Sequence, residues 1–387
     1  MVRHIASIRS VSRRLHVAFL LSVLPVVFLL CSCQGIGGKP VSVNAGPDPT
    51  PAASPSPTPS SAATTYVYMS SDTLLSGAVG KVFTLNASDG SIGTLDMRGI
   101  PRAVAISKDG MLAYVTILDL GKVAVIDTAS NSIVATIPVG KTPETIALTP
   151  NGRFAYVTNT GDGTISVIDT LQRAVTNTIF TDSAPWGIAF SRDGSQAYVP
   201  LLNFDGFHIG GPHSENALAV IDTATQTLSS KLPLITGEAI AASPSRDEIY
   251  LTEENVGVYV ISTQTNQVVA RIDLSTTDEL KGVAVSPDGE RIYVTAHGSI
   301  DIGHVDPPNP TIPAAVYVIS APERTVLAKV NTDPGLMDIV LAEGKTAYLL
   351  RDETSISGLQ TFNTQSLTFG SVQTFASDPL GIAVGRR

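Results

Sequence analysis

Four histidines lie close to carboxylates in two long polar stretches, residues 201–216 and 296–314. The histidines are His208, His213, His297 and His304, and the carboxylates are Asp205, Glu215, Asp301 and Asp306. Imidazole and carboxylate together are the ligands that Zn, Cu, Fe or Mn take in proteins. The sequence therefore predicts a transition-metal site formed by these stretches. The alternative is that polar loops collect histidines without holding a metal, and the spacings match no known metal motif.

Motifs for covalent catalysis are missing from the sequence. It contains no G-x-S-x-G nucleophile elbow, no phosphate-binding glycine loop followed by a helix, and no CxxCH haem-attachment motif. The two cysteines, Cys31 and Cys33, both stand near the N-terminus. These observations favour a binding protein over an enzyme, and they leave the histidine-bearing stretches as the place where enzymatic chemistry would have to occur.

The rest of the chain is organised by a repeat, seen most clearly between Pro143 and Phe180. Four short apolar runs, rich in β-branched residues, are separated there by turn signals such as Asn151-Gly152. One unit of roughly 42 residues is the length expected for a four-stranded propeller blade. A tyrosine in the second strand marks the copies, which contain Tyr114, Tyr156, Tyr198, Tyr250, Tyr293 and Tyr348.

The two ends of the repeat region complement each other. The runs 66–69, 82–86 and 92–97 fit strands two to four of a blade, and the final run around Gly381 fits a first strand alone. Pairing the two fragments would close a ring and remove an exposed sheet edge. First strands begin at Ala103, Thr145, Gly187, Ala239, Gly282, Asp338 and Gly381. We therefore predict an all-β, seven-bladed propeller of four-stranded antiparallel blades over residues 66–387.

The repeat resembles a known family. Tyr156-Val157-Thr158-Asn159 spells the signature of YVTN-type β-propeller repeats, and Ser286–Gly289 and Val167–Thr170 are similar to that family too. The resemblance extends from Tyr66 to Arg387, although only one copy keeps the full signature. The resemblance implies the propeller fold. It does not select one function, because similar proteins include surface-layer proteins, periplasmic propellers and relatives of lactonases.

In such a ring, the residue that opens each first strand should face the mouth of the central channel. In chain order these residues are Arg102, Glu144, Trp186, Glu238, Lys281, Met337 and Leu380. Trp186 is the only tryptophan in the chain. Two carboxylates, two cations and an indole predict a site for a small polar ligand or a glycan ring. The alternative is that these residues pair with one another and plug the channel.

The N-terminus predicts export and a lipid anchor. Residues 1–14 carry four arginines and no acid, and residues 17–30 form an apolar run too short to span a bilayer comfortably. Leu30-Cys31-Ser32-Cys33 is similar to the lipobox of bacterial lipoproteins. We expect a signal peptide over 1–32, lipidation at Cys33, and a Pro/Ser/Ala-rich tether over 33–65. Gln34 after Cys33 favours the outer membrane over the inner membrane.

Charge limits the partners of the propeller. Four of the 25 basic residues precede Cys33, so the mature chain has 21 basic against 34 acidic residues, a net charge of −13. Nucleic-acid binding needs clustered Lys and Arg, and the sequence has no basic stripe. We expect a monomeric cell-envelope lipoprotein whose propeller lies in the periplasm or at the cell surface and binds a protein, glycan or small ligand on the face that carries the two long loops. The alternatives are a metal-dependent enzyme, lactonase-like, hydrolytic or oxidoreductive, and a metal-binding lipoprotein.

Overall fold

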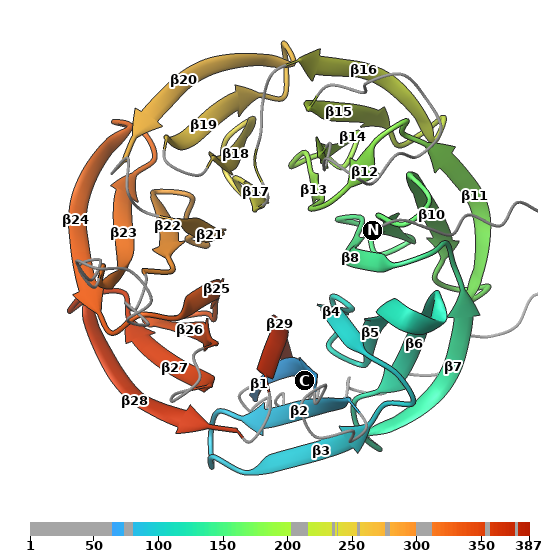
Figure 1. Ribbon diagram of the computed structural model, residues 1–387, viewed down its shortest axis with the longest axis horizontal. Helices are drawn as coiled ribbons and strands as arrows, with labels where there is room; N and C mark the ends of the chain where they lie inside the picture. The colour runs from blue at the N-terminus through green and yellow to red at the C-terminus, as the bar shows by residue number, and fades with distance from the viewer. Residues whose placement is uncertain are drawn as a thin grey trace, which may run out of the picture. The chain divides into compact units, whose positions relative to one another are not determined.

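Seven antiparallel sheets surround a central channel in the computed structural model of the protein (Figure 1). The structure describes residues 64–72, 80–202, 216–233, 237, 239–253, 256–274, 279–298, 312–352, 357–375 and 378–387. Each sheet is one blade, with its first strand at the channel and its fourth at the rim. This confirms the predicted seven-bladed propeller.

The blades follow one another in chain order, except that the first is completed by the last strand. Blade A contains β29 (Asp378–Arg386), β1 (Thr65–Asp72), β2 (Lys81–Asn86) and β3 (Ile92–Asp96). Blade B contains β4 (Pro101–Ile106), β5 (Leu112–Ile117), β6 (Lys122–Asp127) and β7 (Ser132–Pro138), with the 3-10 helix η1 (Leu118–Leu120) between β5 and β6. Blade C contains β8 (Pro143–Leu148), β9 (Phe154–Asn159), β10 (Thr164–Asp169) and β11 (Ala174–Phe180).

The remaining blades keep this order, and blade D has an interrupted first strand. Blade D contains β12 (Ala184–Pro185), β13 (Ala189–Phe190), β14 (Gln196–Leu202), β15 (Ala217–Asp222) and β16 (Thr227–Pro233). Blade E contains β17 (Ile240–Ala242), β18 (Glu248–Glu253), β19 (Gly257–Ser262) and β20 (Gln267–Asp273). Blade F contains β21 (Leu280–Val285), β22 (Arg291–Ala296), β23 (Ala314–Ser320) and β24 (Thr325–Thr332). Blade G contains β25 (Leu336–Leu341), β26 (Thr346–Arg351), β27 (Gly358–Asn363) and β28 (Thr368–Thr374).

Short side-chain hydrogen bonds fix the turns between these strands. In the hairpin before β14, Ser191 Oγ donates to Asp193 Oδ1 at 2.7 Å, and Gly194 adopts a φ of 73°. In the turn after β15, Asp222 Oδ1 accepts the Thr225 N–H at 2.8 Å. Asx-type turns of this kind hold the chain reversal that each hairpin requires. The repeated aspartates at the ends of third strands therefore have a structural role.

The apolar core is divided among the interfaces between blades. The described residues form seven buried clusters, and each cluster combines side chains from two adjacent blades. The second-strand tyrosine is buried in every blade, and Tyr68 is its counterpart in blade A. Tyr156, for example, packs edge-on against Phe190 of the next blade, with ring centroids 5.2 Å apart. The sheets are therefore held mainly by face-to-face burial of apolar surface.

Ring closure depends on the two ends of the propeller. β1 pairs with β29 from Thr65↔Arg386 to Asp72↔Asp378, so strands from opposite ends of the sequence share one sheet. The guanidinium of Arg387 lies 3.9 Å from the centre of the Tyr66 ring, and Arg387 also donates to the Thr128 carbonyl of blade B. These contacts join the closing blade to its neighbour.

Hydroxyl groups of the second strands also connect neighbouring blades near the channel. Thr158 Oγ1 accepts the Thr145 N–H of its own blade at 3.0 Å and donates to the Trp186 carbonyl of the next blade at 2.7 Å. Thr295 makes the same pair of bonds, with the Gly282 N–H and the Met337 carbonyl. The threonine of the Tyr-Val-Thr run is thus a connector between blades. Pro200 and Leu350 occupy this position in blades D and G and have no hydroxyl to make the bond.

Replacing Thr158 by valine should measure the strength of this connection. The Thr158→Val substitution keeps the side-chain shape but leaves a buried N–H and a carbonyl without their hydroxyl partner. We expect the free energy of unfolding in urea to fall by about 1–3 kcal/mol. Thr178→Val, at an exposed position on β11 of the same blade, should change it by less than about 0.5 kcal/mol. Equal losses in the two variants would contradict the connector role.

Candidate functional site

β-bulges in the first strands direct side chains into the channel. The ladder between first and second strand skips residues between Pro101 and Val104 in blade B, and between Leu280 and Val283 in blade F. Blade C skips one residue after Pro143, and blade D leaves a three-residue gap between β12 and β13. A bulge bends the strand and re-aims the unpaired residue. The positions that the regular ladder skips include the predicted ring members Arg102, Glu144, Trp186, Lys281, Met337 and Leu380.

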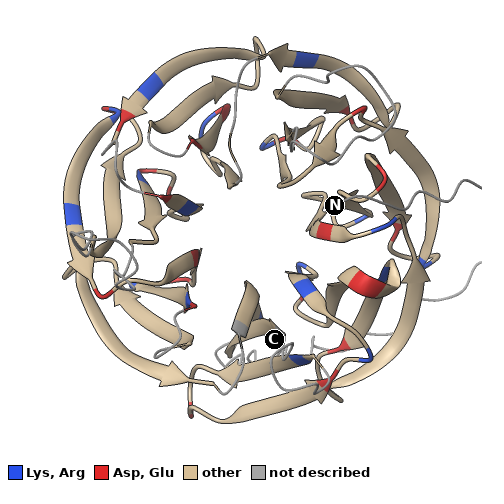
Figure 2. Ribbon diagram, in the orientation of Figure 1, with Lys and Arg blue, Asp and Glu red and all other residues tan. Residues whose placement is uncertain are grey.

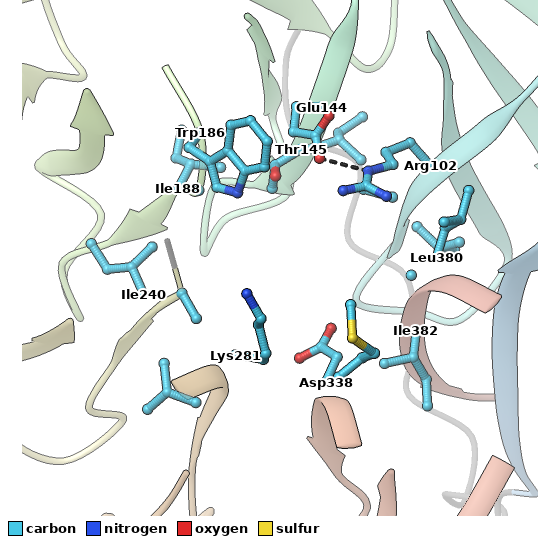
Figure 3. Close-up of a pocket in the computed structure, with 18 residues that line it drawn as sticks. Arg102, Glu144, Thr145, Trp186, Ile188, Ile240, Lys281, Asp338, Leu380 and Ile382 are labelled. Carbon is cyan, nitrogen blue, oxygen red and sulfur yellow. Dashed lines mark hydrogen bonds and ion pairs between the residues drawn. The ribbon is translucent and has the colours of Figure 1, made fainter. Parts of the chain in front are cut away.

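A cavity of about 270 Å³ lies where these side chains meet. Its lining includes Arg102, Glu144, Trp186 and Lys281. Figure 3 shows their side chains around one central space, with Lys281 across from Arg102 and Trp186. Figure 2 shows the mixed charge of the channel wall, basic on β4 and β21 and acidic on β8. The structure therefore brings together four of the five charged and aromatic residues predicted to bind a ligand at the channel mouth, and their ligand-binding role stays a prediction.

An ion pair organises one side of the cavity. Arg102 Nε lies 2.6 Å from Glu144 Oε1, which connects β4 of blade B to β8 of blade C. The Glu144 side chain is almost fully buried, whereas that of Arg102 is 30% exposed. The pair neutralises the buried carboxylate, and the exposed part of the guanidinium remains accessible from the channel.

Lys281 supplies a second cation from blade F. Its Nζ lies 2.7 Å from Glu279 Oε1 just before β21, and its side chain is 18% exposed. Trp186 is half-buried and comes from the gap in the first strand of blade D. Two apolar side chains lie next to Trp186 in the cavity lining: Ile188 of the same blade and Ile240 of blade E.

Asp338 is a lining residue that the sequence analysis did not assign to the site. It follows Met337 on β25, where the bulge turns both residues toward the channel. Its Oδ1 accepts the N–H of Ile339 at 2.8 Å. Protein atoms surround the carboxylate except on the channel side, and this burial raises the pKa of Asp338 to about 6. The sequence signal for Asp338 was its place in the repeat, because the corresponding residue is Ala, Thr or Gly in the other six blades.

Several predicted site residues lie outside the described part of the chain. These are Glu238 of the channel ring, His208, His213 and His304 of the predicted metal site, and the lipidation residue Cys33. His297 is described, and its Nδ1 lies 2.7 Å from the Gly298 carbonyl and 3.9 Å from Glu279 Oε2. Within the described ranges, no group of three or more His, Cys, Asp or Glu side chains is arranged to hold a metal ion. The metal site stays a prediction.

No helix in the part of the chain that the structure describes is long and apolar enough to cross a membrane.

Comparison with known proteins identifies the fold but no family. No family model matches the chain, and no curated protein matches it. Among solved structures, it is similar to the Kuenenia stuttgartiensis hydrazine synthase. The TM-score is 0.57 at 20% identity, covering 77% of this chain and 90% of that one. At this identity the likeness shows the seven-bladed propeller alone, and it transfers no activity.

The raised pKa means that the ionised carboxylate of Asp338 lowers the free energy of unfolding by a measurable amount. Its folded-state pKa of about 6 exceeds the ordinary value of 3.8. The folded protein therefore holds this proton more tightly, and the carboxylate destabilises it increasingly as pH rises from about 4 to about 6. We expect Asp338→Asn to gain stability over the unsubstituted protein across that window, reaching about 3 kcal/mol at pH 7.5. Urea denaturation at pH 4 and pH 7.5 measures the difference.

Asp333→Asn provides the matched control. Asp333 is exposed and precedes β25 in the same blade, outside the cavity lining. The same chemical change at this exposed position should alter the free energy of unfolding by less than about 0.5 kcal/mol. A gain for Asp338→Asn that is the same at both pH values would show that the carboxyl does not titrate as described.

Proposed function

We propose that the propeller is a binding module that holds a small ligand in the mouth of its central channel. The observation that carries this proposal is the convergence of Arg102, Glu144, Trp186, Lys281 and Asp338 on one cavity. Convergent polar groups beside an aromatic side chain in a concavity of a rigid scaffold are typical of a ligand site. Titratable groups with perturbed pKa values gather at such sites as well.

The alternative that the lining residues plug the channel is less consistent with this geometry. Arg102 pairs with Glu144 and Lys281 pairs with Glu279, so each cation is held against the wall. An open volume of about 270 Å³ remains between these pairs. Among the residues that the structure describes, the ion pairs therefore hold the charged groups at the walls of the cavity.

We further propose that the chain belongs with YVTN-type propellers and acts at the cell envelope. The Tyr-Val-Thr-Asn run and the Thr158 bonds between blades support the relationship, and Leu30–Cys33 supports a lipid anchor. A tether over residues 33–65 would then connect the anchored Cys33 to the first strand, which begins at Thr65. The membrane is one partner in this proposal, and the channel ligand is the other.

Intrinsic fluorescence provides the test of the channel site, because Trp186 is the only tryptophan of the chain. Sugars, amino acids, organic acids and nucleosides are titrated against the full chain while its emission and melting temperature are followed. We expect at least one compound class to shift both, since a ligand at 100 times its Kd stabilises the folded state by about 2.7 kcal/mol. Emission and melting that never respond would contradict small-ligand binding in the channel.

Two substitutions localise any binding to the cavity. Glu144→Gln breaks the pair with Arg102 at the cavity wall, and we expect it to weaken binding by about tenfold or more. Glu323→Gln is the matched control at an exposed position between β23 and β24 and should bind as the unsubstituted protein does. Equal affinity of all three proteins would place the ligand elsewhere. Trp186 is itself part of the cavity and reports binding through its emission, so the melting temperature provides a measure of binding that does not depend on this residue's fluorescence.

The anchor is tested separately at Cys33. Replacing the thiol by a hydroxyl removes the atom that would carry the lipid, so Cys33→Ser should move the protein from the membrane fraction to the soluble fraction. The unsubstituted protein provides the reference, and Cys31→Ser provides the control for a cysteine within the predicted signal peptide. A Cys33→Ser protein that stays with the membranes would refute the anchor.

A further inference from the structure

The cavity has apolar and polar sectors contributed by different blades. Trp186 and Ile188 of blade D and Ile240 of blade E form an apolar sector. Polar groups come from both sides of the ring: Lys281 and Asp338 of blades F and G lie across the cavity from this sector, and Glu144 of blade C lies beside Trp186. A ligand that fits both must therefore carry an apolar face and a polar edge.

The charges of the described lining residues cancel. Arg102 and Lys281 are cationic, and Glu144 and Asp338 are carboxylic acids. An anionic ligand would meet the two acids, and a cationic ligand would meet the two bases. A hydroxyl group both donates and accepts hydrogen bonds, so a polyol can use all four groups. This balance favours an uncharged ligand with several hydroxyls.

The size of the cavity limits the ligand to about one ring. Its volume of about 270 Å³ is below the ~300–1,000 Å³ that sites for drug-sized molecules occupy. An indole offers a flat apolar surface of the kind that covers the apolar face of a ring. A pyranose has this combination of a C–H face and a hydroxyl-bearing edge.

Asp338 is a lining residue whose carboxylate the packing of the fold does not require. The corresponding residue is Ala, Thr or Gly in the other six blades, and a Cβ added to Gly282 would lie 2.9 Å from the Asp338 Cα. The ring of first strands therefore closes with small residues at this position and does not require a carboxylate. Oδ1 of Asp338 accepts the Ile339 N–H at 2.8 Å, and the carboxylate lines the cavity. A carboxylate has acceptor sites beyond one such bond, so this group can accept a hydrogen bond from a ligand.

We propose that the channel cavity binds a single uncharged pyranose, whose C–H face packs against Trp186 and whose hydroxyl donates to Asp338. The assignment rests on the proposed small-ligand function and narrows it to one class. Asp338 is the residue that determines specificity for a hydroxyl at this position, because a site built to accept a hydrogen bond from a hydroxyl rejects an analogue that lacks it. Arg102 and Lys281 offer donors to the remaining hydroxyls.

Three sugars with the same ring and different charge test the proposal on the full chain. Glucose is uncharged, glucuronate carries a carboxylate and glucosamine carries an ammonium group. Galactose and mannose are added to the titration so that the orientation of one hydroxyl does not decide the result. Trp186 emission and melting temperature are measured at pH 7.5 for the unsubstituted protein, Asp338→Asn and the exposed control Asp333→Asn.

We expect at least one uncharged hexose to bind at least about tenfold more tightly than both charged sugars. Asp338→Asn should weaken that binding by about tenfold or more, and Asp333→Asn should not change it. A charged sugar that binds best, or Asp338→Asn affinity equal to that of the unsubstituted protein, would overturn the proposal. A response to other compound classes but to no hexose would overturn it as well, and the small-ligand function would stand. No response to any compound would defeat both.

Discussion

The structure depends on the burial of each blade against its two neighbours. A four-stranded sheet of about 42 residues cannot bury both of its faces alone, and each of the seven apolar clusters is completed by the adjacent blade. An open row of blades would expose an apolar face at each end. The pairing of β1 with β29 removes both ends, so the ring is the arrangement in which no blade lacks a neighbour.

Ring closure also sets the properties of the channel. Seven first strands converge at the centre, and the close approach of neighbouring strands needs small residues there. A Cβ added to Gly381 would lie 2.3 Å from the Arg102 carbonyl, which leaves no space for a side chain. The bulges then move the preceding residues out of the ladder and toward the axis. The scaffold therefore presents a ring of positions that packing does not restrict to one residue type.

The fold and most of the channel ring could be predicted because both follow from periodicity. The repeated tyrosines and turns determine the blade, and register then places Arg102, Glu144, Trp186 and Lys281 at the channel. Asp338 could not be found by that rule, because a regular strand turns successive side chains to opposite faces. The bulge after Leu336 breaks the alternation and brings both Met337 and Asp338 to the cavity. The histidine stretches interrupt the repeat, so periodicity predicts nothing about how they fold.

A propeller offers an internal comparison that few folds provide, because each position has six counterparts in one chain. Residues required by the fold keep their type around the ring, as the buried tyrosines do. The channel positions differ from blade to blade, and some of them carry groups that reduce stability, such as an acid whose burial raises its pKa to about 6. Burying charged groups seldom stabilises a protein, even when they are paired as Arg102 and Glu144 are. The energetic cost of this lining is therefore the physical basis of the proposal that the lining binds a ligand.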